Sequence, residues 1–385
     1  MSEWKKVPIK DVCVGFYDGP HATPPVSETG GIFLGISNIT KDGHFDFSSI
    51  KYIGDDYMPK WTKRVTPQKD DIVFSYEATL NLYAVIPDGF YGCLGRRMAL
   101  IRTNKQLANH KYLFYYFFSK NWRNLISEKT IVGATVDRIP IATFPDFEIE
   151  LPSLDVQNKI ATILSRYDSL IENYQKQIKL LEESAQRLYK EWFIDLRFPG
   201  HENTKIVDGV PEGWAPSQLG QLVEFKRGKT ITKKDVIDGD IPVVAGGLEP
   251  AYYCNKSNTA KRVITVSGSG ANAGFTRIYF EKVWASDCSF VDSSTTPFLH
   301  FVYCFLKDNK TTIDNLQKGA AQPHVYAKDI NSLGICIPIE SVLKSFEGTA
   351  SMYFDTISSF QSQIHLLTEA RDRLLPKLMS GEINL

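Results

Sequence analysis

Two long stretches of the chain carry the same pattern of apolar positions. From Ile160 to Trp192 an apolar residue recurs at alternating steps of four and three, and from Phe346 to Leu378 the same steps recur with one interruption, at Arg371. Such steps define the a and d positions of heptads, so each stretch predicts a long helix with one apolar seam. A single seam would more simply indicate an amphipathic helix on a globular core. Two matched seams in one chain instead favour a two-helix coiled coil.

The two stretches are copies of one another. "QIKLLEESAQRL" (177–188) and "QIHLLTEARDRL" (363–374) are identical at seven of twelve positions and lie 186 residues apart. The same offset aligns Gly133 with Gly319, so the repeat keeps one register over more than fifty residues. A short alternating run precedes each helix, "FPDFEIELP" before the first and "NSLGICIP" before the second, and both predict strands. The chain therefore contains an internal duplication.

The segment between the helices indicates their orientation. About 145 residues, from Phe193 to Ile337, join the end of one helix to the start of the other, which is enough for a domain. Because the ends of a domain usually lie close together, we expect the second helix to start where the first stops. The pair is then antiparallel, with an approximate two-fold axis and one domain at each end. "IDLRFPGHENTKIVDGVPEGW" predicts a linker into the second domain.

The regions outside the helices predict two domains of mixed structure. Trp4 and Trp214 open corresponding stretches, so the domains share a plan although their sequences have diverged. A helical stretch, "HKYLFYYFFSKNWRNLI", comes late in the first domain. Short strand-like runs are "GIFLGIS" and "DDIVFSY" in the first domain and "DIPVVAGG", "RVITVSG" and "VWASDCSFV" in the second. The predicted fold class is α+β: two α/β domains separated by an antiparallel two-helix coiled coil, with an internal pseudo-two-fold repeat.

Composition and charge narrow the class of protein. Of the 385 residues, 43% are hydrophobic and 23% are charged, as in an ordinary globular protein, and the formal net charge is zero. A neutral chain is not a uniformly basic nucleic-acid binder, although it can carry local basic surfaces. The six cysteines have no metal-ligand spacing, and no apolar run is long enough to predict a membrane span. We therefore expect a cytoplasmic protein with no membrane partner.

The motifs of familiar catalytic sites do not match this sequence. An adenine-specific DNA methyltransferase needs an [Asn/Asp]-Pro-Pro-aromatic loop, which "TPPV" and "CIPI" do not provide. The run "FKRGKT" ends like a phosphate-binding loop, but the preceding Gly220 lies too far from Gly228. The glycine-rich "GSGANAG" lacks the acidic residue of a dinucleotide site and predicts a tight turn or a close approach to DNA. We expect no catalytic residues and no metal site; the alternative is an enzyme with an unfamiliar motif.

Several segments together carry a family resemblance. They are "LPSLDVQNKIATIL", "LYKEWFIDLRFPG", "VPEGW" and "LLPKLMSGEINL" around the helices, "DGPHATPP" followed by "IFLGISNI" in the first domain, and "SGSGANAGF" with "VWASDCSFV" in the second. In these segments the chain resembles the DNA-specificity subunits of type I restriction–modification systems, over essentially its whole length and in the family's order. It departs from the family pattern at Arg371 and at "IPIESVLKSFEG".

The resemblance implies a division of labour along the chain. Residues 1–150 and 201–337 would be two target recognition domains, each reading one half of a bipartite, asymmetric DNA site. Residues 151–200, with the linker, and residues 338–385 would be the central and distal conserved helical regions. Such a subunit is not catalytic.

The resemblance also implies the partners. They are double-stranded DNA, two copies of a methyltransferase subunit bridged by the helices, and restriction/translocase subunits that join through the methyltransferase subunits. The chain would carry no cofactor, because S-adenosylmethionine and ATP are expected only on the partner subunits. The alternative is a free-standing DNA-binding or architectural protein that uses the helices as a coiled-coil spacer.

Candidate DNA contacts follow from side-chain chemistry, because Arg, Lys, Asn and Gln read base edges and Lys and Arg bind phosphates. A solvated surface is an equally good explanation for any one of them, but the 226–234 cluster as a whole favours DNA. Leu180 and Leu366 are repeat-equivalent and lie beside the seam, so they either dock partner subunits or only widen the apolar stripe. The DNA candidates are His21, Thr23, Lys60, Lys63, Arg64, Arg96 and Arg97 in the first domain, and Lys226, Arg227, Lys229, Lys233, Lys234, Asn255, Lys256, Lys261 and Arg262 in the second.

Overall fold

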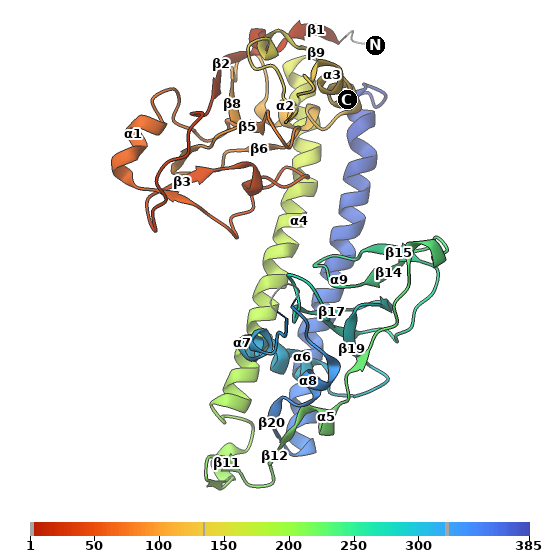
Figure 1. The fold of residues 1–385 in the computed structure, drawn as a ribbon. Coiled ribbons are helices and arrows are strands. Elements are labelled where there is room, and N and C mark those ends of the chain that lie inside the picture. The colour runs from red at the N-terminus through yellow and green to blue at the C-terminus, as the bar shows by residue number, and fades with distance from the viewer. Residues whose placement is uncertain (1–3, 134, 320–322) are drawn as a thin grey trace. The chain divides into compact units, whose positions relative to one another are not determined.

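The computed structural model describes residues 4–133, 135–319 and 323–385, and the chain divides into two compact units (Figure 1). The first unit consists of Met1–Glu172 and His365–Leu385, and the second of Asn173–Ile364. Each unit therefore contains one module of strands and short helices, together with one end of each of two long helices.

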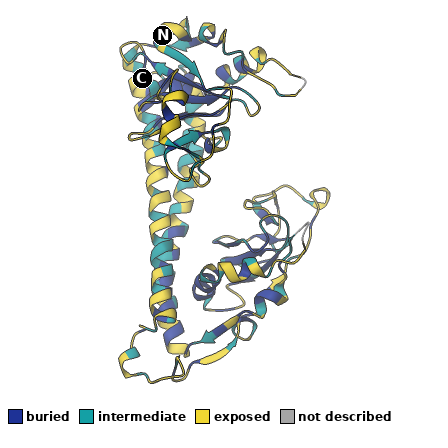
Figure 2. Ribbon diagram, turned by 60° about the vertical axis from the view of Figure 1, so that its left-hand side comes forward, coloured by how far each residue is buried: buried dark blue, intermediate teal, exposed yellow. Residues whose placement is uncertain are grey.

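The two long helices are α4 (Leu154–Tyr189), which ends in a π-helical turn (η5, Lys190–Ile194), and α9 (Glu340–Met379). Both begin two residues after a proline, Pro152 and Pro338, and each of these prolines directly follows a strand, where it has no backbone N–H to extend the ladder. Their heptad positions are buried or half-buried, while the positions between them are mostly exposed (Figure 2). The predicted pair of long amphipathic helices is confirmed.

The helices run in opposite directions in both units. In the second unit the ring of Tyr174 stacks on that of Phe360, with centroids 4.8 Å apart, and Tyr189 meets Phe346 edge-on at 6.3 Å. Residue numbers thus rise along α4 as they fall along α9. In the first unit the start of α4 shares a core with the end of α9, so the predicted antiparallel pairing holds there too.

A two-stranded ladder leads into each long helix. In the first unit β1 (Lys5–Pro8) pairs with β9 (Glu148–Leu151), and in the second β12 (Ala215–Gln218) pairs with β20 (Gly334–Ile337). The strands that precede the helices are those predicted from the sequence. The register is also duplicated, because the first residue of β1 faces the last residue of β9, and the first residue of β12 faces the last residue of β20.

The first module contains two sheets, a four-stranded antiparallel one and a three-stranded one whose central strand β3 runs parallel to β7. The four-stranded sheet has the order β2 (Cys13–Asp18), β8 (Met98–Thr103), β5 (Ile72–Ser75) and β6 (Tyr83–Val85), and the other has β4 (Tyr52–Ile53), β3 (Gly31–Leu34) and β7 (Gly92–Leu94). The helical elements are η1 (Ile9–Val12), η2 (Ile36–Asn38), η3 (Asp55–Tyr57), α1 (Met58–Trp61), α2 (His110–Tyr116), α3 (Lys120–Lys129) and η4 (Phe144–Asp146).

The second module repeats this topology strand for strand, including the parallel pair, here β14 and β18. Its four-stranded sheet has the order β13 (Lys226–Arg227), β19 (Cys288–Asp292), β16 (Val263–Ser267) and β17 (Thr276–Tyr279), and its three-stranded sheet has β15 (Tyr252–Cys254), β14 (Ile241–Val244) and β18 (Trp284–Ala285). The other elements are η6 (His201–Asn203), β10 (Ile206–Val207), β11 (Val210–Pro211), α5 (Leu219–Leu222), η7 (Lys233–Asp235), α6 (Leu299–Asp308), α7 (Lys310–Asn315) and α8 (Ala327–Asn331).

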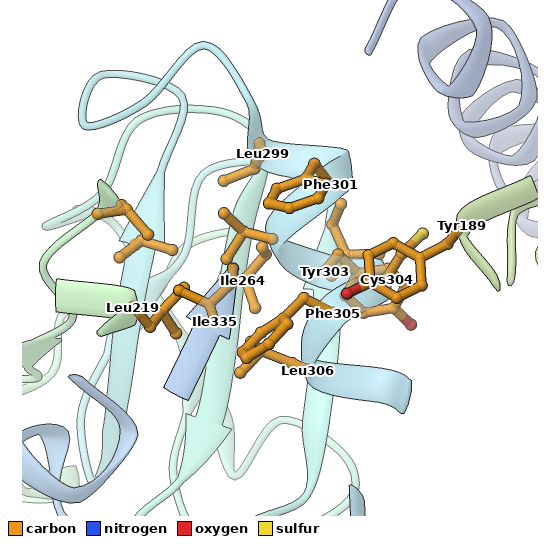
Figure 3. Packing of buried hydrophobic residues seen from close by; sticks show 14 of the residues in the cluster. Tyr189, Leu219, Ile264, Leu299, Phe301, Tyr303, Cys304, Phe305, Leu306 and Ile335 are labelled. Atoms are coloured by element: carbon orange, nitrogen blue, oxygen red, sulfur yellow. The ribbon is translucent and has the colours of Figure 1, made fainter. Parts of the chain in front are cut away.

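Each module packs an aromatic core against its ends of the long helices. In the first, Asn109 caps α2 by accepting hydrogen bonds from two backbone N–H groups, and Trp122 of α3 is fully buried and donates to the Tyr83 hydroxyl at 2.8 Å. In the second, α6 is buried almost all round and Tyr189 of α4 packs beside it (Figure 3). The predicted α+β class with two modules and an antiparallel helix pair is confirmed. In the described part of the chain, no helix is both long and apolar enough to cross a membrane.

Candidate nucleic-acid interface

Several strand ends of the first module meet at one end of its four-stranded sheet. β2 ends at Asp18, β5 ends at Ser75 and β8 begins at Met98, and the register sets Asp18 opposite Ala99 and Ser75 opposite Met98. Because neighbouring strands are antiparallel, the loops that follow β2 and β5 leave the sheet at the same end as the loop that precedes β8. Loops carried by a rigid sheet are common positions for binding residues. One of these three loops is "DGPHATPP", which carries part of the family resemblance.

Charged and polar side chains at this end of the sheet form what we call the first strand-end cluster: Asp18, His21, Arg64, Glu77 and Arg97. The Asp18 carboxylate accepts a hydrogen bond from the Arg64 guanidinium and lies 3.1 Å from Nε2 of His21. Nε of Arg97 lies 3.1 Å from Oε2 of Glu77. The structure thus brings together three of the predicted DNA-binding residues, His21, Arg64 and Arg97, from separate segments of the chain.

Tyr76 lies within this cluster and has an unused donor. Its ring meets that of His21 edge-on, with centroids 6.5 Å apart, and its buried hydroxyl has no hydrogen-bond partner among the described residues. Burial, together with the negative charges of Asp18 and Glu77, raises the pKa of Tyr76 to about 12. The hydroxyl is therefore protonated at neutral pH and able to donate.

The same end of the second module's sheet has the same framework. Arg227 of β13 faces Ser289, as Asp18 faces Ala99 in the first module, and Ser267 faces Cys288, as Ser75 faces Met98. Backbone hydrogen bonds beyond the strands also match in pairs. Gly19 N donates to Met98 O in the first module, and Gly228 N donates to Cys288 O in the second, both at 2.8 Å. Tyr76 N donates to Arg97 O, and Gly268 N donates to Asp287 O, both at 3.1 Å. Ile139 N donates to Tyr76 O at 2.8 Å, and Val325 N donates to Gly268 O at 3.1 Å.

The matched strand register and backbone hydrogen bonds define corresponding residues in the two modules. In the second module, the residues at this end of the sheet form what we call the second strand-end cluster: Arg227, Ser269, Asp287 and His324. The Ser269 hydroxyl donates to the Asp287 carboxylate. Arg227, Asp287 and His324 line a cavity of about 190 Å³. Gly268 also lines it, at the position that Tyr76 occupies in the first module, so the second cluster is open where the first is filled by a ring.

A glycine is required at the same point of both frameworks. A Cβ on Gly19 would lie 2.3 Å from the carbonyl oxygen of Gly95, and a Cβ on Gly228 would lie 2.4 Å from that of Ser286. Both distances are shorter than any real contact, so the loop after the first sheet strand approaches its neighbour closely only because it lacks a side chain. These glycines belong to the runs "DGPHATPP" and "FKRGKT", and they have a structural role.

The glycine-rich run "GSGANAG" forms a tight turn, which is one of the two structures that its sequence predicted. It connects β16 to β17, and Gly274 N donates to Ser267 O at 2.9 Å. Gly270 and Gly274 have φ values of +80° and +86°, which residues with a side chain rarely adopt.

The structure does not gather the remaining basic candidates into the strand-end clusters. Arg262 stands at the opposite end of β16 from Ser267 and forms an ion pair with Asp355 of α9. Lys60 and Lys256 each lie over a tryptophan ring, 5.1 Å from its centroid. The exposed candidates are Thr23, Lys60, Lys63, Arg96, Lys226, Lys229, Lys233, Lys234, Asn255, Lys256 and Lys261. Their contact with DNA stays a prediction.

The two leucines proposed for partner docking face solvent. Leu180 of α4 is 59% exposed and Leu366 of α9 is 56% exposed, so neither is buried in the seam. Their role in docking also stays a prediction.

Sequence reasoning missed the acidic members of the clusters because it took Arg, Lys, Asn and Gln as the residues that read base edges and did not consider carboxylates. Asp18 and Asp287 lie inside "DGPHATPP" and "VWASDCSFV", so the resemblance already marked both segments. The offset of 186 residues also aligns Arg138 with His324, whose backbones bridge to Glu77 and Ser269 respectively.

Comparison with known proteins identifies the class of molecule. The family model described as the type I restriction modification DNA specificity domain matches residues 1–183 and 211–346. The MjaIX specificity subunit of a type I restriction enzyme from Methanocaldococcus jannaschii is 30% identical over 298 residues, covering 71% of this chain and 69% of that protein. The putative MjaX specificity subunit of the same organism is 23% identical, covering 99% of this chain and 94% of that protein.

A solved structure shares the fold. The crystal structure of the S subunit of a type I restriction–modification system from M. genitalium aligns with a TM-score of 0.59 and 19% identity, covering 97% of this chain and 96% of that one. The two modules and the pair of long helices therefore have the fold of that protein. The chain belongs to the family of type I restriction–modification specificity subunits. As a member of that family it is non-catalytic and acts with DNA and with other restriction–modification subunits.

Proposed function

We propose that each module reads one half of a bipartite, asymmetric DNA site and that the two long helices bridge two copies of a methyltransferase subunit. In this proposal residues 1–150 and 201–337 are the target recognition domains, and residues 151–200 and 338–385 are the helical regions between them. The observation that supports it most directly is that the modules share one topology and matched backbone hydrogen bonds, yet present different side chains at corresponding positions. Two readers with one framework and different side chains suit a site whose halves differ in sequence.

The partners divide the chemistry among themselves. Restriction/translocase subunits join through the methyltransferase subunits, which carry S-adenosylmethionine, while ATP is bound by the translocase. The chain itself contributes DNA-binding side chains, among them Lys226 and Lys229, which flank Arg227 in the sequence, and Lys233 and Lys234, which follow a few residues later. Phosphate contacts by these lysines would position the module on the duplex without reading sequence.

Two measurements test the proposal. The chain should co-purify with a methyltransferase subunit and, with that subunit, direct methylation to one split sequence in the DNA of the host cell. Replacing residues 1–150 with the first module of another family member should change one half of that sequence only. A change in both halves would show that the modules are not independent readers, and absence of any methyltransferase partner would instead favour a free-standing DNA-binding protein.

A further inference from the structure

The two strand-end clusters carry opposite charges at corresponding positions. Asp18 at the end of β2 corresponds to Arg227 at the end of β13, because they face Ala99 and Ser289 in the same register. Arg97, just before β8, corresponds to Asp287, just before β19, because the carbonyl oxygens of both accept the equivalent backbone hydrogen bond. The acid and the base have thus exchanged places between the modules, while the backbone that holds them is the same.

This exchange matters because the two side chains have opposite hydrogen-bonding abilities. A guanidinium only donates and matches the two acceptors, N7 and O6, of guanine in the major groove. An ionised carboxylate only accepts and matches the amino group of cytosine. A base edge presented to the same framework position therefore meets a donor in one module and an acceptor in the other.

Both clusters are able to exchange their present contacts for contacts with DNA. The Arg64 side chain is 54% exposed, so its ion pair with Asp18 is open to solvent and readily exchanged. Nε of Arg97 makes no hydrogen bond to a described residue in spite of its ion pair with Glu77, so Arg97 also has an unused donor. The Tyr76 hydroxyl donates no hydrogen bond to any described residue, so its donor is unused. In the second module the cavity beside Arg227 leaves room for an incoming group.

We propose that the strand-end clusters are the base-discriminating centres of the two modules, and that the exchange of Asp18 and Arg97 for Arg227 and Asp287 is what makes the two half-sites differ. This inference rests on the proposed function, since it assigns the reading of each half-site to a particular place in its module. The basic residues outside the clusters then contribute affinity rather than sequence preference.

The test exchanges the two charges within one module of the full-length chain, assembled with its methyltransferase subunit. One variant carries Arg227→Asp with Asp287→Arg, and a second carries Asp18→Arg with Arg97→Asp. The readout is the methylation rate on DNA duplexes in which each base pair of the mapped site is varied in turn. Each variant should change the preferred base pair at one position of one half-site by roughly 5- to 150-fold, the range for one well-made base contact, and leave the other half-site unchanged.

Matched controls separate base reading from a general electrostatic effect. Lys69→Ala in the first module and Lys310→Ala in the second each remove an exposed ion pair, with Asp88 and Asp314 respectively, away from the clusters. Both controls should keep the original preference at every position.

The milder Asp287→Asn variant keeps the side-chain volume and covers the case in which a double exchange prevents folding. It should still methylate the original site but with weakened discrimination at one base pair. An assembled, active charge-exchange or Asp287→Asn variant with unchanged preference at every position would overturn the inference and leave the proposed function standing. A wild-type complex whose methylated sequence does not depend on this chain would overturn both.

Discussion

Arg371 interrupts the apolar seam of α9, and replacing it with the leucine that the pattern calls for should destabilise the protein. One of its terminal nitrogens, Nη1, lies 2.8 Å from Oδ1 of Asp168 on α4, and the other carboxylate oxygen accepts a hydrogen bond from the Tyr115 hydroxyl. The side chains of Arg371 and Asp168 are only 12% and 15% exposed. The guanidinium therefore partners a carboxylate that is largely removed from water.

The magnitude follows from what Arg371→Leu leaves behind. The Asp168 charge would keep only the Tyr115 hydroxyl as a partner within this group. Removing one member of a buried ion pair costs about 3–5 kcal/mol, and burying the leucine side chain returns about 1–2 kcal/mol. The net loss is about 2 kcal/mol in the free energy of unfolding. For a unit of roughly 150–250 residues this corresponds to a Tm lower by about 4–8 °C.

A matched variant isolates the cause. Arg371→Leu combined with Asp168→Leu and Tyr115→Phe removes both charges and the hydroxyl, so none of these three side chains is left as a buried polar group without a partner. Its stability should lie within about 1 kcal/mol of the wild type, because apolar replacement of a whole buried ion pair is often neutral. The assay is thermal unfolding of the full chain followed by circular dichroism, with hydrogen exchange of the peptides from α9 to locate the change. If Arg371→Leu alone is as stable as the wild type, the ion pair does not hold the helices together.

Three further predictions concern other parts of the chain. Glu347→Gln should lower the free energy of unfolding of the second unit by about 1–2 kcal/mol, measured by urea denaturation. The Glu347 carboxylate accepts hydrogen bonds from the backbone N–H groups of His300 and Phe301 and lies 2.8 Å from the His300 ring nitrogen. An unchanged denaturation midpoint would count against this prediction. Burial alone would raise the pKa of Asp292, but hydrogen bonds from Ser294 and from the Ala260 N–H outweigh burial and lower the pKa. The stability that this carboxylate provides is therefore present above its ordinary pKa of about 4 and is lost as the pH falls below that value. The stability gap between wild type and Asp292→Asn should therefore be constant from pH 5 to 7 and shrink below pH 4, and a gap independent of pH would exclude the explanation. Leu180→Glu with Leu366→Glu should abolish co-purification of a methyltransferase subunit and leave the unfolding free energy within about 0.5 kcal/mol, because both side chains are exposed; unfolding of the isolated chain would contradict docking.

The long helices and the strands before them could be predicted because their signals are local. A heptad seam and a short alternating run are read from neighbouring residues, and α4, α9, β9 and β20 fall where those patterns stand. The partner of Arg371 could not be predicted in the same way. The seam shows that an arginine breaks the pattern, but Asp168 lies 203 residues away along the chain, and only the antiparallel pairing brings the two together.

The strand-end clusters could not be predicted from the sequence for a different reason, namely that the offset between corresponding residues is not constant. The separation between corresponding residues falls from 209 positions (Asp18 and Arg227) to 192 (Ser75 and Ser267) and finally to 186 (Arg138 and His324). A search at the single offset of 186 therefore loses the correspondence upstream of Gly133, where connecting loops of unequal length intervene. Backbone hydrogen bonds survive these length changes because the sheet fixes its strand ends, whereas the loops and their side chains are free to differ. A duplicated framework with unequal loops suits the proposed reading of two different half-sites, since the framework can be kept while each module's recognition chemistry changes independently.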